Sequence, residues 1–76
     1  MVTAYVMVKA HTGDADRLRS EIEGIDGVTE AHIVAGDVDL IVKVSVDTPA
    51  AVKDAAATHV QDIEGVESTQ TYIAMD

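Results

Sequence analysis

Cysteine is absent from this chain of 76 residues, which excludes disulfides, thiolate metal sites and cysteine nucleophiles. The three histidines, His11, His32 and His59, show no close ligand spacing, so we expect no metal site, no cofactor and no catalytic histidine. A chain this short buries only about 60% of the surface that its unfolded form exposes, and disulfides, metals or self-association usually compensate. By elimination, the composition favours self-association.

Positive charge and aromatic side chains are also scarce. Five Lys and Arg stand against 14 Asp and Glu, which gives a formal net charge of -9. Such a surface repels phosphates, and two tyrosines, Tyr5 and Tyr72, are too few for a base-stacking platform, so we expect no direct nucleic-acid partner. The acidity fits a halophilic protein from a high-salt cytoplasm, where salt screens the charge; an acidic docking face is the alternative.

Long apolar runs are missing as well. No stretch approaches the roughly 20 apolar residues that cross a membrane, and the first residues lack the basic start and apolar region of a signal peptide. We therefore expect a soluble, cytoplasmic protein without a membrane partner. The length predicts a single domain over residues 1–76.

What the sequence does contain is a degenerate internal repeat. Ile25-Asp26-Gly27-Val28 recurs half a chain later as Ile63-Glu64-Gly65-Val66, and each copy follows a helical pattern and precedes a strand pattern. Two copies of one β-α-β unit indicate a pseudo-symmetric fold.

Periodicity predicts the elements of each unit. Residues 2–10 alternate as a strand, and residues 14–24 place Ala15, Leu18 and Ile22 on one helical stripe. Residues 28–35 and 39–46 read as two strands joined by a short turn, in which Gly36 would supply any positive φ.

The second helix is expected over residues 49–62, before a last strand at 66–75. Asp47 or Thr48 would cap its start, with Pro49 near the first helical position. Its buried stripe would contain Val52, Ala55 or Ala56, His59 or Val60, and Ile63.

The order β-α-β-β-α-β predicts an α+β, ferredoxin-like fold: a four-stranded antiparallel sheet of order 4-1-3-2 with two helices on one face. The uncovered face is too apolar for a face in contact with water alone, so a second copy of the chain would cover it and form a dimeric α/β sandwich. The side chains expected on that face are Tyr5, Met7, Ala31, Ile33, Ile41, Thr69, Thr71 and Ile73.

Two segments are candidates for ligand binding. In the turn Gly36-Asp37-Val38-Asp39, two carboxylates beside a glycine can accept hydrogen bonds from a ligand amine; an ordinary hairpin explains the same residues. In the last strand, Thr69 and Thr71 share a face and offer two hydroxyls, although threonine also simply suits strands. No nucleophile–base pair is readable, so no catalytic residue is predicted.

Three segments together resemble the effector-binding (RAM) domain of the Lrp/AsnC family. They are Gly27-Val28, the run Gly36-Asp37-Val38-Asp39-Leu40, and Ser68-Thr69-Gln70-Thr71-Tyr72-Ile73, and the resemblance covers nearly the whole chain. It implies a regulator of amino-acid metabolism that dimerises through its sheets and assembles into octamers. It also implies that small effectors, usually amino acids, bind at interfaces between dimers.

Carried over by position, the resemblance places Gly36 and Asp37 in the effector-binding turn, with Asp39 opening the next strand. Thr69 and Thr71 would add hydroxyls. Family members often carry an aromatic residue where Val38 stands, so the ligand preference is expected to differ. The family's helix-turn-helix is missing, so the chain resembles the stand-alone variants, which sense ligands or co-assemble with full-length regulators.

These observations lead to three hypotheses of different classes. The leading one is an amino-acid-responsive regulatory module that acts as a homo-oligomer and affects transcription or metabolism indirectly. The second is a ligand-independent interaction module that hetero-oligomerises with full-length Lrp/AsnC regulators. The third, which the absence of a catalytic motif disfavours, is a small enzyme on a dimeric α+β scaffold.

Overall fold

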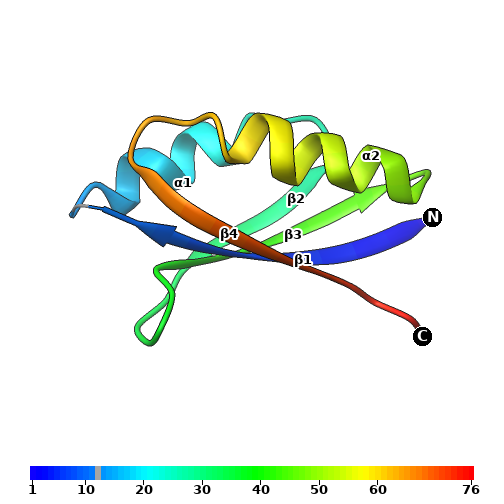
Figure 1. Ribbon diagram of the computed structural model, residues 1–76, viewed down its shortest axis with the longest axis horizontal. Helices are drawn as coiled ribbons and strands as arrows, with labels where there is room; N and C mark the ends of the chain where they lie inside the picture. Colours follow the sequence, from blue (N-terminus) through cyan, green and yellow to red (C-terminus); the bar gives the residue numbers. More distant parts are fainter. Residues whose placement is uncertain (12) are drawn as a thin grey trace.

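A computed structural model describes residues 1–11 and 13–76, with the side chain of Ala57 left out of the description. Its elements follow in the order β1 (Val2–Ala10), α1 (Ala15–Glu23), β2 (Val28–Ile33), β3 (Leu40–Val46), α2 (Pro49–Lys53), the π-helix η1 (Asp54–Val60) and β4 (Val66–Ile73). The helices cover one face of a single sheet, and the loop between β2 and β3 extends away from them (Figure 1).

The sheet is antiparallel throughout, in the order β2-β3-β1-β4. This is the predicted 4-1-3-2 order, so the ferredoxin-like α+β fold is confirmed. In the two central strands, β1 and β3, every second side chain is buried against the helices. The helix side chains that meet them are aliphatic. The fully or almost fully buried side chains are Ala4, Val6, Val8, Leu18, Ile22, Ala31, Leu40, Val42, Val44, Val52, Ala55, Ala56 and Val60.

The start of α2 confirms one of the two predicted caps. Thr48 is the N-cap: its hydroxyl accepts the Ala51 N–H at 3.1 Å, and Pro49 follows at the first helical position. The helix continues directly into η1, where Ala55 and Ala56 are both buried.

The internal repeat is a repeated turn. Gly27 and Gly65 have φ values of 96° and 102°, in the region that side chains rarely adopt. In each copy the residue after the glycine donates its N–H to the carbonyl of the repeat's isoleucine at 3.1 Å. A Cβ at Gly27 would lie 2.7 Å from Val46 Cγ1, so both the backbone and the packing require glycine there.

A β-bulge follows each of these turns. Thr29 is inserted between the pairs Val28–Val44 and Glu30–Lys43, and the register shifts in the same way where β4 pairs with β1 after Val66. An extra residue moves every later side chain of the strand to the opposite face.

Because of the two bulges, the uncovered face of the sheet differs from the predicted one. Residues directly opposite in an antiparallel pair share a face, and Thr69, Thr71 and Ile73 stand opposite the inward-facing Val8, Val6 and Ala4. The prediction was right for Tyr5, Met7 and Ile41. It was wrong for five side chains, which lie on the helix face: Ala31, Ile33, Thr69, Thr71 and Ile73.

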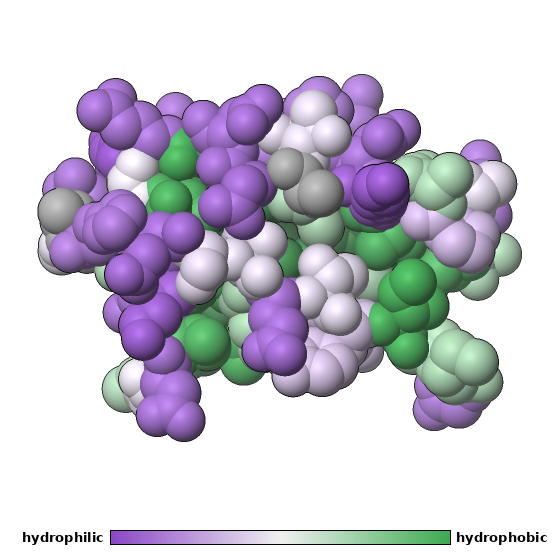
Figure 2. All heavy atoms as spheres, in the orientation of Figure 1, coloured by the Kyte–Doolittle hydropathy of each residue, from purple (hydrophilic) through white to green (hydrophobic). Residues whose placement is uncertain are grey.

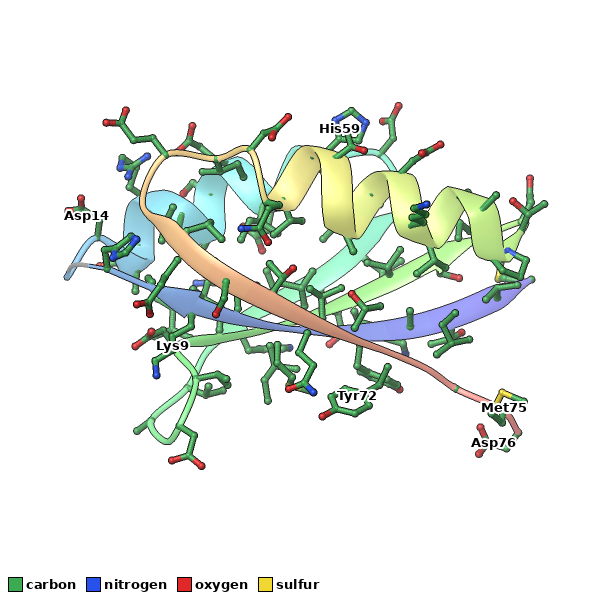
Figure 3. All side chains as sticks on the ribbon, in the orientation of Figure 1. Lys9, Asp14, His59, Tyr72, Met75 and Asp76 are labelled. Atoms are coloured by element: carbon green, nitrogen blue, oxygen red, sulfur yellow. The ribbon has the colours of Figure 1, made fainter. Side chains whose placement is uncertain are left out.

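The face without helices, called the open face below, is mixed in character. Tyr5 and Tyr72 stand opposite each other and are 38% and 51% exposed. Figure 3 shows Tyr72 and Lys9 pointing away from the helices. By register the open face consists of Thr3, Tyr5, Met7, Lys9, Glu30, His32, Ile41, Lys43, Ser45, Ser68, Gln70 and Tyr72.

Candidate functional site

The first candidate segment is the loop between β2 and β3, closed by the hydrogen bond from Val34 N–H to the Asp39 carbonyl at 2.9 Å. Gly36 and Asp37 lie exposed at its tip. The expectation that Gly36 supplies a positive φ was wrong, because only Gly27 and Gly65 have positive φ among the described residues. A Cβ on Gly36 would also meet no atom within 4 Å. Nothing in the described chain therefore requires glycine at this position.

Asp39 lies at the base of the loop and is half-buried. Its carboxylate accepts the Ala10 N–H at 2.8 Å, and its own N–H donates to the Val8 carbonyl at 2.9 Å. This residue is bound into the sheet, whereas Asp37 makes no hydrogen bond or ion pair within the part of the chain that the structure describes.

The second candidate segment lies on β4. The Thr69 hydroxyl donates to Gln61 Oε1 at 2.9 Å, so it is already paired within the chain. Thr71 lines an apolar groove of about 230 Å³ between β4 and α2, together with Pro49, Val52, Lys53, Ala56 and Ile73. Figure 2 shows apolar side chains at the end of the molecule where the C-terminus lies. Near the C-terminus, Ile73 and Met75 are both exposed.

One chain does not bring the two segments together. The loop extends from the side of the sheet that lacks helices (Figure 1), whereas Thr69 and Thr71 face the helices from the edge strand β4. Strand β1 separates β3 from β4 in the sheet. Within the described residues, no hydrogen bond joins the loop to Thr69 or Thr71.

The open face carries Glu30, a carboxyl group whose pKa is shifted by its neighbours. Glu30 Oε1 lies 3.0 Å from His32 Nε2, and Glu30 Oε2 lies 3.8 Å from Lys43 Nζ. The hydrogen bond with His32, helped by the Lys43 ammonium, holds the pKa of Glu30 below its usual range. The other two histidines, His11 and His59, are exposed, and no group of three His, Asp or Glu in the described part of the chain is arranged to hold a metal ion.

The sequence analysis did not identify a cleft that lies apart from both candidate segments. Its volume is about 410 Å³, and it opens where the Gly27 turn meets the end of β3 and the second helix. The sequence feature that lines this cleft is the first copy of the internal repeat, at Asp26 and Gly27. The repeat by itself indicates a fold, not a binding site. The cleft is lined by Asp26, Gly27, Ser45, Val46, Asp47, Ala51, Asp54, Ala55 and His59.

Comparisons with known proteins identify the family of the chain. The family model of the Lrp/AsnC ligand binding domain matches residues 3–76. The regulatory protein AsnC of Haemophilus influenzae is 32% identical over 62 residues, which are 82% of this chain and 41% of that protein. The chain thus spans less than half the length of that regulator. In the described residues, no helix is long and apolar enough to cross a membrane.

Solved structures agree with the fold. A crystal structure from Thermus thermophilus superimposes with a TM-score of 0.94 at 28% identity, covering 100% of this chain and 95% of that one. A transcriptional regulator from Neisseria meningitidis, solved as a complex with L-Met, shares the fold at 14% identity, with a TM-score of 0.85 over 99% of this chain and 50% of that one.

Together the fold and the family model define a ligand-binding module of the kind that regulatory proteins contain. The chain belongs to the Lrp/AsnC ligand binding domain family.

Proposed function

We propose that this chain is an amino-acid-binding regulatory module, not an enzyme, which works in the cytoplasm as a homo-oligomer. The observation that carries the proposal is the family match over residues 3–76. The L-Met complex of the Neisseria meningitidis regulator supports amino acids as the ligand class, because that protein shares the fold.

The loop tip supports a binding role for Gly36 and Asp37. Gly36 has no left-handed φ and no close neighbour among the described residues, so the fold does not require a glycine there. Its lack of a side chain would let a ligand approach the backbone closely. Asp37 is exposed beside it and can accept hydrogen bonds from a ligand ammonium. Thr69 and Thr71 remain proposed contributors, and they would act from a different chain than the loop.

The open face supports self-association. Two tyrosines, a methionine and an isoleucine occupy the middle of a sheet face that no helix covers. An apolar, aromatic patch of this kind marks a contact surface, and a second copy is the simplest partner. A net charge of -9 per chain opposes that association, so we propose that added salt strengthens it.

Ligand and assembly would then be linked. An amino acid that binds only the assembled form stabilises that form by its difference in affinity for the two states. At a ligand concentration ten times the Kd, this stabilisation is about 1.4 kcal/mol, equivalent to about 6–11 °C in melting temperature for a domain of this size.

The assembly is tested by sedimentation or light scattering on matched variants. Ile41→Lys places a charge on the open face and is expected to weaken self-association at least about tenfold. Thr58→Lys makes the same charge change at an exposed position on η1, and should leave the mass unchanged. Equal masses for both variants would refute the open-face contact.

A second candidate function has its own supporting observation. The loop and the Thr69–Thr71 pair lie on different sides of the sheet, and the Thr69 hydroxyl is already paired. A module that only co-assembles with full-length Lrp/AsnC regulators needs neither segment to bind a ligand. Capture of such a regulator from native extract, at equal yield with wild type and Asp37→Asn and without added amino acid, would favour this alternative.

A further inference from the structure

The hydrogen bonds between β1 and β3 continue beyond the last residue pair, and the side chain of Asp39 accepts one of them. The last pair is Val8–Leu40, and the next bond runs from Asp39 N–H to the Val8 carbonyl at 2.9 Å. The following N–H of β1, that of Ala10, donates to Asp39 Oδ2 at 2.8 Å. The carboxylate thus takes the place that a main-chain carbonyl would take in a longer strand.

The position of Ala10 explains why this acceptor matters. The pairing of β1 with β3 ends at Val8–Leu40, so the Ala10 N–H, which faces β3, has no main-chain partner there. On the other edge of β1, the register with β4 shifts between Lys9 and Ala10. The next N–H, that of His11, turns to the Gly65 carbonyl at 3.0 Å. Asp39 therefore satisfies a half-buried backbone donor at the irregular end of the central strand.

Asp39 also closes the loop that carries Gly36 and Asp37. Its carbonyl accepts the Val34 N–H at 2.9 Å, which fixes the four residues 35–38 between two anchored ends. One residue consequently ties the loop to β1 through two bonds and to the end of β2 through a third.

We infer that Asp39 is a positioning residue for the proposed ligand site: its side-chain oxygen holds the loop against β1, so that Asp37, and not Asp39, is left to meet the ligand. The ligand part of this inference rests on the proposed function; the loop part does not. Asp39 needs an oxygen acceptor for its task, and an uncharged amide can supply one. Asp37 has no partner among the described residues, and its proposed contact with a ligand ammonium needs its negative charge.

The loop part is tested without any ligand, by amide hydrogen exchange at Ala10 and residues 35–38. Asp39→Ala removes the acceptor and is expected to speed exchange there at least about tenfold, as local opening becomes easier. Asp39→Asn keeps an oxygen acceptor and should stay within about threefold of wild type. Unchanged exchange in Asp39→Ala, or equal acceleration in both variants, would overturn the positioning role.

The ligand part uses the same variants with whichever natural amino acid raises the melting temperature of the wild type. Affinity is expected to fall at least about tenfold in Asp39→Ala and to be restored to within about threefold by Asp39→Asn. Asp37→Asn should lose affinity like Asp39→Ala while its loop exchanges like wild type. If Asp39→Asn binds as weakly as Asp39→Ala although its loop is protected, Asp39 contacts the ligand directly and the assignment is wrong.

The two failures are distinguishable. If no amino acid binds the wild type, the proposed function and the role of Asp37 fail together, and the exchange data still decide whether Asp39 holds the loop. If an amino acid binds and Asp37→Asn binds it normally, the division of roles between the two carboxylates fails alone.

Discussion

The turn that occurs twice, at Gly27 and Gly65, and the loop at Gly36 both contain a glycine, but the fold constrains the two kinds of glycine differently. At Gly27 and Gly65 the backbone is left-handed, and a Cβ would come within 3.0 Å of a neighbouring side chain. At Gly36 neither condition holds. The chain's own backbone and packing explain the repeated glycines. Nothing among the described residues explains the loop glycine, which is why we propose that a ligand approaches it.

The largest effect is expected at Gly27. Gly27→Ala forces a side chain into a left-handed backbone and against Val46 Cγ1, at a cost of about 1–3 kcal/mol in the free energy of unfolding. Chemical denaturation measures the loss. A stability equal to wild type would show that the repeated turn does not need its glycine, and the comparison would no longer hold.

Gly65→Ala tests whether the two repeats respond alike. Its φ of 102° carries a similar backbone strain, but the closest atom to a Cβ is Nη2 of Arg17, the end of a long, exposed side chain that can move. We expect a smaller loss, about 1–2 kcal/mol, in the same denaturation experiment. A loss larger than that of Gly27→Ala would place the tighter constraint in the second repeat.

Gly36→Ala is the opposite case. Because nothing surrounds the added methyl group and the backbone is not left-handed, stability should be unchanged or rise by up to about 1 kcal/mol. Ligand binding should nevertheless fall. A clear loss of stability would mean that the loop requires its glycine for folding, and would remove the argument for a binding role.

The smallest effect concerns Glu30, an exposed residue whose partners lie within the chain. Because its pKa is lowered in the folded state, its contribution is present above the unfolded-state pKa and is lost as pH falls through the folded-state pKa. Glu30→Gln should flatten the acidic side of the stability profile slightly. His32→Gln, which removes the first cause of the shift, should raise the pKa of Glu30 in an NMR titration. An unmoved Glu30 pKa would contradict the pairing.

Much of the fold follows from local chemistry that a sequence displays. Alternation in β1, the apolar stripe of α1 and the Thr48–Pro49 helix start all act within a few residues, and each is found where it was predicted. The faces of β2 and β4 beyond the turns were predicted wrongly. A bulge adds one residue without any marker in the sequence, since Thr29 is an ordinary strand residue.

The candidate site was less predictable for a similar reason. Asp37 and Asp39 are two residues apart and chemically identical. The hydrogen bond from Ala10, 29 positions away in sequence, anchors the Asp39 carboxylate, whereas the Asp37 carboxylate has no partner among the described residues. The proposed contacts of Thr69 and Thr71 with a ligand depend on a second chain. A long-range hydrogen bond and a contact with a second chain both lie beyond local sequence patterns. The sequence could therefore indicate the two segments but not which residue in them anchors the loop and which binds a ligand.

The central claim is that the Gly36–Asp37 tip binds an amino acid in an assembled module. Its most direct test is thermal melting, with light scattering in parallel, of the wild type and Gly36→Ala against each of the twenty amino acids at millimolar concentration. At least one amino acid is expected to raise the melting temperature of the wild type by several degrees, in the range of about 6–11 °C near ten times its Kd. Gly36→Ala, which should be at least as stable as the wild type without ligand, is expected to respond less. No shift with any amino acid, or the same shift in both proteins, would contradict it.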